Sequence, residues 1–244
     1  MSTMRYINRL RKAVRLSRHS AYRKGLRQGV GAAIEHENAL RPLVLAALVD
    51  VGANKGQFSL MTRALFPNAV IHAFEPLDEA AGKFRALFAG DSGVTLHQMA
   101  LGEEAGTAEI HVSGHADSSS LLPITARQNE LFPGTASIGT QTIVVARGDD
   151  VLGTFDLPRP LMIKLDVQGF ELSALRGLPR MLARADFVYV EVSFVELYAN
   201  QSLADEVIAF LREQGFRLAG IYNLTTGPDG TSVQADALFA RASS

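Results

Sequence analysis

A glycine-punctuated segment, residues 47–59, carries the first side chains whose types and spacing could bind a ligand. An apolar run ends at Asp50, Gly52 and Gly56 follow, and a helical pattern begins near Phe58. This order predicts a strand, a tight turn and a helix N-terminus, where a ligand can lie against bare backbone. Glycine permits both the turn and the close approach. The spacing G-A-N-K-G differs from the G-x-G-x-x-G of dinucleotide-binding proteins and favours a ligand that presents an ammonium and a carboxylate.

A second acidic residue ends the next predicted strand. Residues 69–76 read A-V-I-H-A-F-E-P, so Glu75 lies at the carboxyl end of that strand, 25 residues after Asp50. This is near the interval of about 20 residues seen in ribose-binding βαβ units. A carboxylate here can accept hydrogen bonds from both ribose hydroxyls, although acidic residues also open turns before proline. The two segments together predict S-adenosylmethionine as the ligand. The predicted cofactor-binding residues, which include an apolar wall for adenine, are Asp50, Gly52, Asn54, Gly56, Ser59, Glu75, Ala100 and Leu101.

The second predicted chemical centre lies in residues 161–171. The strand that begins at Leu161 carries Asp166 near its carboxyl end, and a further strand over 187–194 carries Glu191 toward the same edge. Methyl transfer to oxygen needs alignment and a group that accepts or tolerates a proton. The two carboxylates are therefore predicted as catalytic groups, or as ligands of Mg²⁺ or another divalent cation.

Two other residue types were weighed for this centre. Lys164 is expected to pair with an acidic side chain, because an unpaired buried lysine is costly. Among the histidines, His115 is the predicted general base, although a lone histidine is more often structural or solvated.

Predicted helices and strands alternate along the rest of the chain, as an α/β fold requires. A helix is expected over 77–89 and a third strand over 94–101. Residues 106–145 interrupt this rhythm with a Gly/Ser/Thr-rich insertion. Such insertions are usually functional or mobile, so it is interpreted either as a substrate-facing flap or as a surface hairpin without a ligand role.

The chain has 244 residues, 47% hydrophobic content, no cysteine and a net charge of −1, which predicts one globular domain without disulfides or thiolate sites. Residues 1–41 hold ten of the 24 Lys and Arg but two of the 25 acidic residues. A helix is expected around 4–28. This basic arm could lie on an anionic membrane surface, dock on an acidic partner or a second protomer, bind phosphate, or cap the domain. The expected domains are the basic helical extension 1–41 and the catalytic domain 42–244, in a cytoplasmic protein that could associate peripherally with a membrane.

Several motifs together resemble the FkbM-type methyltransferases. They are D-V-G-A-N-K-G-Q-F-S, F-E-P, A-L-G, K-L-D-V-Q-G-F-E-L-x-A-L-R-G and E-V-S-F-x-E-L-Y, spread over about residues 45–240. The resemblance implies a Rossmann-like class I methyltransferase fold with seven strands, the last antiparallel, together with S-adenosylmethionine and O-methylation of sugars, glycans or natural products. Residues 215–223 and 235–241 fit the terminal strand pair of that fold. Gln168 stands where many relatives have glutamate.

The sequence therefore predicts an S-adenosylmethionine-dependent O-methyltransferase with a small-molecule or glycan acceptor. Two alternatives stay open. One is a nucleic-acid methyltransferase that uses the basic arm, which is disfavoured because the chain lacks an N-P-P-Y-type motif and its remainder is acidic. The other is a non-catalytic binding module. Oligomeric state is open, and a homo-oligomer is one expectation.

Overall fold

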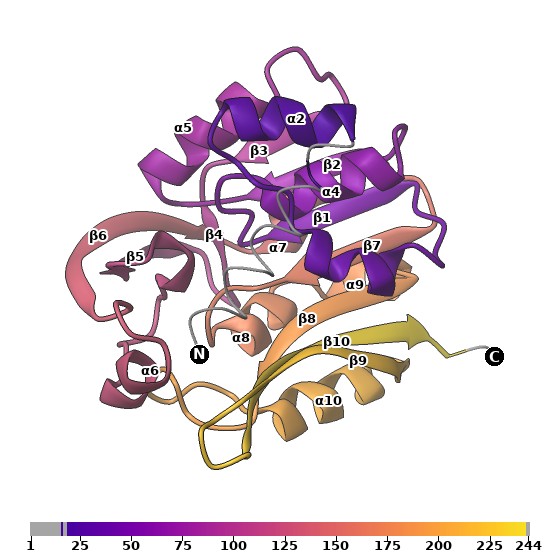
Figure 1. The fold of residues 1–244 in the computed structure, drawn as a ribbon. Helices are drawn as coiled ribbons and strands as arrows, with labels where there is room; N and C mark the ends of the chain where they lie inside the picture. Colours follow the sequence, from indigo (N-terminus) through magenta and orange to yellow (C-terminus); the bar gives the residue numbers. More distant parts are fainter. Residues whose placement is uncertain (1–15, 17–18, 243–244) are drawn as a thin grey trace.

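The structure is a computed structural model that describes residue 16 and residues 19–242. Its centre is a seven-stranded sheet with strand order β3-β2-β1-β7-β8-β10-β9 (Figure 1). β10 runs antiparallel to both β8 and β9, whereas the other pairings in the sheet are parallel. The expected seven-stranded, mostly parallel sheet with its last strand antiparallel is confirmed. In spatial order the strands are β3 (Val94–His97), β2 (Val70–Phe74), β1 (Ala47–Val51), β7 (Leu161–Leu165), β8 (Phe187–Ser193), β10 (Ser232–Arg241) and β9 (Phe216–Thr226).

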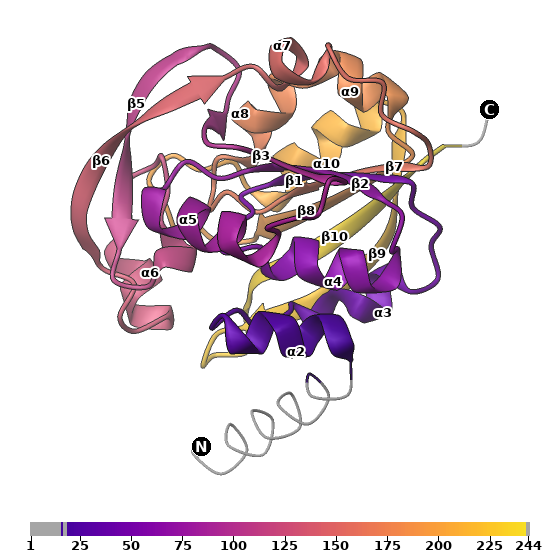
Figure 2. The same cartoon turned by 90° about the horizontal axis from the view of Figure 1, so that it is seen from above.

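Helices cover both faces of the sheet, which makes three layers (Figure 2). One face carries α2 (Ser20–Arg27), η1 (Ile34–His36), α3 (Glu37–Leu40), α4 (Gln57–Leu65) and α5 (Asp78–Leu87). The other carries α7 (Gly148–Leu152), α8 (Glu171–Arg176), α9 (Pro179–Arg184) and α10 (Ala204–Glu213). Separate hydrophobic clusters fill the two interfaces. Every residue of β1 and β7 is buried, as a parallel strand covered on both faces must be.

The expected third strand over 94–101 is divided in two by the structure. β3 ends at His97, and Ala100–Leu101 form β4, which pairs with Val145 and Ala146 instead of continuing the main sheet. The backbone leaves the main sheet because β6 offers a new partner just beyond the edge strand.

The insertion forms a second, three-stranded sheet with order β4-β6-β5. β5 (Gly106–Ser113) and β6 (Ser137–Ala146) make a long antiparallel pair, and between them lie η2 (Ala116–Ser118) and α6 (Ala126–Leu131). The Ser120 hydroxyl donates to the Gln168 carbonyl at 2.6 Å. The insertion is thus fixed to the carboxyl end of β7.

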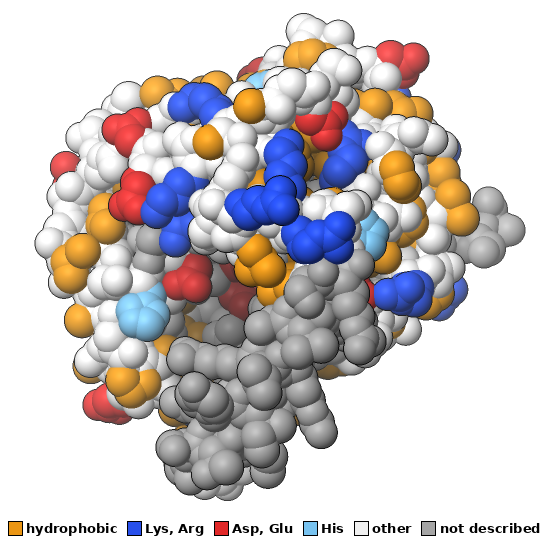
Figure 3. All heavy atoms as spheres, turned by 45° about the horizontal axis from the view of Figure 1, so that its top comes forward, with side chains coloured by type: hydrophobic (Ala, Val, Ile, Leu, Met, Phe, Trp, Pro, Cys, Tyr) orange, Lys and Arg blue, Asp and Glu red, His pale blue; other side chains and the backbone are white. Residues whose placement is uncertain are grey.

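The N-terminal helix expected over 4–28 is described from Ser20 onward as α2, while most of its first part lies outside the described residues. α2 packs on α4, and Tyr22 donates to Glu37 at 2.9 Å. Lys and Arg side chains gather over α2 (Figure 3). Within residues 19–242, no helix combines the length and apolar character needed to cross a membrane. The domain boundary at residue 41 and the partner of the basic arm stay predictions.

Candidate active site

A cavity of about 440 Å³ opens at the carboxyl ends of β1, β2 and β7. This is the edge at which doubly wound sheets bind ligands. The N-terminal segment 29–36 and the insertion also contribute to its wall, so elements far apart in sequence enclose it. Lining residues used below are Gly52, Asn54, Gln57, Glu75, Leu77, Ala100, Leu101, Asp166, Gln168, Phe170, His36, Asp117 and Ser120.

Gly52 lets β1 and β7 approach each other at the floor of this cavity. Its φ is +77°, and an added Cβ would lie 1.9 Å from the carbonyl oxygen of Asp166. Glycine is required at position 56 for a different purpose. The φ of Gly56 is +91°, and a Cβ there would meet the rings of Phe84 and Phe88. Gly56 therefore serves helix packing, and it does not line the cavity.

Asp50, Ser59 and Lys164 form a buried polar group beneath the glycine turn. The Ser59 hydroxyl donates to Asp50 Oδ2 at 2.6 Å, and Lys164 Nζ lies 3.1 Å from Asp50 Oδ1. Lys164 also donates to the carbonyl of Gly52 at 2.9 Å. Burial alone would lower the pKa of the Lys164 ammonium, but Asp50 and Asp166 raise it above its usual value. Lys164 is thus paired with an acid, as expected, and the group holds the turn from below.

Glu75 lies at the end of β2 and is almost fully buried. Its two oxygens accept hydrogen bonds from the backbone N–H groups of Asn54, at 2.9 Å, and Leu77, at 2.8 Å. Burial raises the pKa of Glu75 to about 7, although these two N–H groups and Lys164 lower it. A carboxyl group that changes charge near neutral pH therefore faces the cavity.

Two buried acceptor atoms next to Glu75 are unpaired. Among the described residues, neither Asn54 Oδ1 nor Gln57 Oε1 has a hydrogen-bond partner. Buried polar atoms are normally hydrogen-bonded, so these oxygens indicate a ligand that donates hydrogen bonds. An ammonium group has the required donors.

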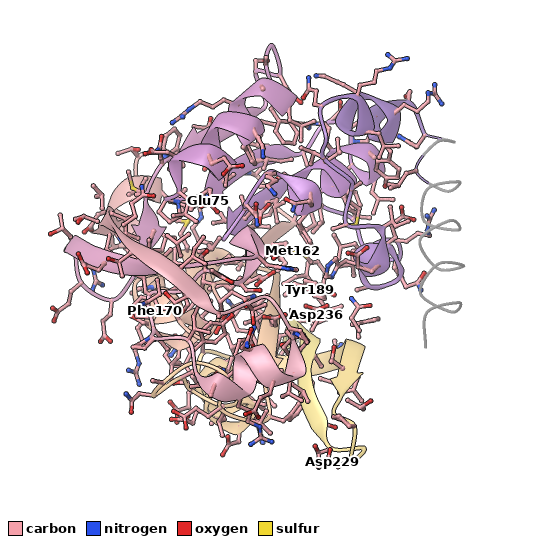
Figure 4. The ribbon with its side chains drawn as sticks, turned by 60° about the vertical axis from the view of Figure 1, so that its left-hand side comes forward. Glu75, Met162, Phe170, Tyr189, Asp229 and Asp236 are labelled. Carbon is pink, nitrogen blue, oxygen red and sulfur yellow. The ribbon has the colours of Figure 1, made fainter. Side chains whose placement is uncertain are left out.

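Apolar side chains line the neighbouring part of the cavity. Leu77, Leu101 and Phe170 contribute here, and Leu101 is 1% exposed. Glu75 and Phe170 lie on one side of the view in Figure 4, away from Tyr189 and Asp236. This end of the cavity suits a flat aromatic ring.

A second polar network lies at the ends of β7 and β8. The Gln168 side-chain amide donates to Asp166 Oδ1 at 2.6 Å and to Glu191 Oε2 at 3.0 Å. The Tyr198 hydroxyl donates to Gln168 Oε1 at 2.6 Å. Burial and the charge of Asp166 raise the pKa of Glu191 well above its usual value. Gln168 has φ +55°, a left-handed conformation that fixes its amide between the two carboxylates.

The divalent cation expected on Asp166 and Glu191 does not fit this arrangement. The amide N–H groups of Gln168 point at the carboxylate oxygens that a cation would need, and a hard cation requires six or more oxygen ligands. Within the described part of the chain, no three His, Asp or Glu side chains cluster as a metal site would require. We therefore derive no step through a metal.

The structure brings most predicted site residues to the cavity, but not all of them. Those that line it are Gly52, Asn54, Glu75, Ala100, Leu101 and Asp166. Asp50 and Ser59 lie beneath it, Gly56 packs against α5, and Glu191 lies behind Gln168. His115 is exposed on the insertion, where a Cβ added to Gly134 would lie 2.8 Å from its Nε2. His115 does not line the cavity, and its role stays a prediction.

Sequence reasoning missed two groups at this site. Glu171 accepts from the backbone N–H groups of Val167 and Gly169, at 2.9 and 3.2 Å, and so shapes the turn after β7. Its position two residues after a glycine was a usable signal. His36 lines the cavity and lies 3.2 Å from Asp236. No local pattern could reveal that pair, because its members are 200 residues apart in the chain.

Comparison with known proteins places the chain in a family. The model described as "Methyltransferase FkbM domain" matches residues 50–218, which is more than half of the chain. The chain belongs to the FkbM methyltransferase family. This match extends from the glycine turn at Asp50 to β9, and it includes the main groups of the cavity floor. It excludes His36 and Asp236.

Two named methyltransferases are moderately similar to this chain. The 2-O-methyltransferase NoeI of Sinorhizobium fredii is 29% identical over 63% of this chain, which spans 66% of that protein's length. The 31-O-demethyl-FK506 methyltransferase FkbM of Streptomyces tacrolimicus is 27% identical over 75% of this chain and 76% of its own. Among solved structures, the precorrin-6y C5,15-methyltransferase of Geobacter metallireducens aligns with TM-score 0.48 and 13% identity, covering 86% of this chain and 88% of that one.

Proposed function

We propose that this chain is an S-adenosylmethionine-dependent O-methyltransferase that acts on a hydroxyl of a sugar, glycan or natural product. Membership of the FkbM family supports methyl transfer. The names of NoeI and of the FK506 enzyme describe O-methyltransferases. The observation that carries the proposal is the cavity itself, in which Glu75 and two unpaired amide oxygens lie beside an apolar wall.

The residues of the cavity fit the parts of this cofactor. Glu75 accepts hydrogen bonds from the ribose hydroxyls, since its carboxylate is held by Asn54 and Leu77. Asn54 Oδ1 and Gln57 Oε1 accept from the ammonium group. Leu101 and Phe170 contact the adenine ring. Asp50 and Ser59 act from below, by fixing the turn, and do not touch the ligand.

The bound cofactor supplies a methyl group on a positively charged sulfur. Asp166, half exposed at the cavity wall, accepts a hydrogen bond from an acceptor hydroxyl and so fixes the orientation of the acceptor. Gln168 keeps the Asp166 carboxylate in place, and the Ser120 contact brings the insertion over the acceptor. Alignment of this kind accounts for much of the acceleration in group transfer.

Acidic side chains around the acceptor position make a polyanion an unfavourable acceptor. Asp117 and Asp166 line the cavity, and Glu191 lies behind Gln168. Like charges repel strongly where water is partly excluded. Hydroxyl-rich neutral acceptors, by contrast, are hydrogen-bond donors that carboxylates bind well.

Calorimetry with S-adenosylmethionine and S-adenosylhomocysteine tests the cofactor assignment directly. We expect micromolar binding of both, unchanged by Mg²⁺, and no binding of NAD. Methyl transfer is then measured on neutral glycosides and polyketide alcohols, with short DNA and RNA as controls. Binding without transfer to any hydroxyl would favour a non-catalytic binding module. Absence of binding would remove the proposal.

A further inference from the structure

His36, a histidine of the N-terminal segment that lines the cavity, is paired with Asp236 on the antiparallel strand of the sheet. His36 belongs to η1 and Asp236 to β10, and His36 Nδ1 lies 3.2 Å from Asp236 Oδ2. Their side chains are 19% and 13% exposed. Tyr189 and Asp236 lie together in Figure 4, and the Tyr189 hydroxyl lies 3.0 Å from the same His36 nitrogen.

The surroundings of His36 Nδ1 define which ring nitrogen carries the proton. A carboxylate at 3.2 Å would repel a nitrogen lone pair, which favours the tautomer in which Nδ1 carries the proton and donates to Asp236. The Asn223 side-chain nitrogen lies 3.2 Å from the same His36 nitrogen, but it donates to Asp236 Oδ2 at the shorter distance of 2.7 Å, so Asp236 is the acceptor that these groups share. The lone pair of His36 is then on Nε2, the nitrogen that none of these three groups contacts.

The ring is held by packing as well as by hydrogen bonds. The Phe58 ring meets it edge-on at a centroid distance of 5.4 Å, and the Tyr189 ring does so at 5.6 Å. Burial, together with the nearby Asp236 charge, raises the pKa of the Tyr189 phenol, so this group stays neutral. The charged and titratable groups facing the ring are thus Asp236 on β10 and Tyr189 on β8, with neutral Asn223 on β9.

We propose that His36 takes the proton from the acceptor hydroxyl during methyl transfer, and that Asp236 positions it for this role. The inference rests on the proposed function. In the step, the acceptor oxygen forms a bond to the methyl carbon while the carbon–sulfur bond breaks. The electron pair of the broken bond stays on the sulfur, which becomes a neutral thioether. The hydroxyl proton moves to His36 Nε2, giving an imidazolium that returns the proton to water.

The pair fits this role better than the other candidates in the site. His36 and Asp166 line the same cavity, whereas His115 does not. Asp166 then binds a neighbouring hydroxyl of the acceptor, and the proton goes to an imidazole, which is ordinarily a stronger base than a carboxylate. The orienting carboxylate behind a histidine is a recurrent arrangement in proton transfer.

The tautomer is tested first, by ¹⁵N NMR of histidine-labelled protein without any ligand. At pH 8 we expect His36 with a protonated Nδ1 and a bare Nε2, and in Asp236→Asn a loss of this preference. A bare Nδ1, or a spectrum that Asp236→Asn leaves unchanged, would overturn the proposal. Circular dichroism and the unfolding temperature of the variant establish that it is folded.

Kinetics form the second arm, with the neutral hydroxyl acceptor that the wild-type protein methylates best. His36→Gln should bind S-adenosylmethionine as the wild type does, while kcat falls by about 100-fold or more at unchanged KM. His19→Gln, which alters an exposed histidine before α2, is the matched control and should behave as wild type. Retention of kcat within threefold in His36→Gln would reject the assignment.

The two arms separate failure of this inference from failure of the proposed function. If the wild-type protein does not bind S-adenosylmethionine, the proposed function fails, while the NMR result still reports on the His36–Asp236 pair. If it binds and transfers methyl groups but His36→Gln does so equally well, the proposed function stands and the base is another group.

Discussion

Gly52 and Asp166 place the ends of β1 and β7 in direct backbone contact. The missing side chain of Gly52 leaves room for the Asp166 carbonyl oxygen, which would lie 1.9 Å from any Cβ at that position. The contact joins the glycine turn after β1 to the aspartate that follows β7, and both residues line the cavity. Lys164 reinforces it by donating to the Gly52 carbonyl.

Replacing Gly52 with alanine should therefore disrupt the site. The clash is with backbone, and the φ of +77° is unfavourable for alanine, so we expect a loss of about 3 kcal/mol or more in the free energy of unfolding. Gly82→Ala is the matched control. Gly82 lies within α5 with nothing near its missing Cβ, and alanine there should stabilise by up to about 1 kcal/mol. Urea unfolding compares the two variants, and equal stabilities would contradict the prediction.

Glu75→Ala should weaken S-adenosylmethionine binding by about 2–4 kcal/mol, because it removes an ionised acceptor of two hydrogen bonds. Glu79→Ala, on the exposed face of α5, should leave the affinity unchanged. Calorimetry at pH 8 measures both. Equal affinities of wild type and Glu75→Ala would discard the ribose assignment.

The same carboxyl group predicts a pH dependence of cofactor binding. The pKa of Glu75 is raised by burial to about 7, so its carboxylate form, which accepts hydrogen bonds, grows as pH rises from 6 to 8. Affinity in the wild-type protein should rise by about tenfold over this interval. In Glu75→Gln the affinity should be lower than in the wild type and should not change with pH. An equally steep profile in that variant would assign the dependence to another group.

Asp166→Asn should bind the cofactor normally and lose most of its turnover. Asparagine keeps the shape of the side chain but accepts a weaker hydrogen bond from the hydroxyl of the methyl acceptor. We therefore expect kcat to fall by about 10²-fold or more. Calorimetry and methyl-transfer rates are measured on the same preparation. Full activity would remove Asp166 from the mechanism.

Gln168→Glu should convert the network around Asp166 into a cation site. The substitution replaces an amide that donates to two carboxylates with a third carboxylate, which faces Asp166 and Glu191. Without metal the variant should be less stable than wild type, and Mg²⁺ or Mn²⁺ should restore about 1–3 kcal/mol. Thermal unfolding with and without the metal is the measurement. An equal response of the wild-type protein would show that Gln168 does not exclude the cation.

Glu171 predicts how the stability of the ligand-free protein varies with pH. Burial raises the pKa of Glu171 to about 7, although the N–H groups of Val167 and Gly169 lower it. The folded state then binds the proton more tightly than the unfolded state. The stabilisation that this proton gives to the folded state is therefore complete below about pH 4.5 and is lost as pH rises through 7. Glu171→Gln, which keeps an oxygen acceptor, should flatten this part of the curve in chemical unfolding. An unaltered slope would contradict the assignment.

The sequence by itself determined the sheet and the glycine turn and acidic strand end that form part of the cavity wall. Asp50, Gly52 and Glu75 are read from short segments because strand ends, glycine turns and helix starts are local events, set by residues within a few positions of each other. The parallel strands then had to bring these ends to one edge. The terminal strand pair, by contrast, was predicted from the resemblance to the FkbM-type family.

Only the tertiary structure decided which polar groups meet across the sheet. Gln168 places its amide between Asp166 and Glu191, on different strands, and this removed the expected metal site. Gly56 proved to face Phe84 and Phe88, and His36 met Asp236 across nearly the whole chain. Such contacts depend on how helices and strands pack together, and no spacing in one segment encodes the residue that will lie opposite.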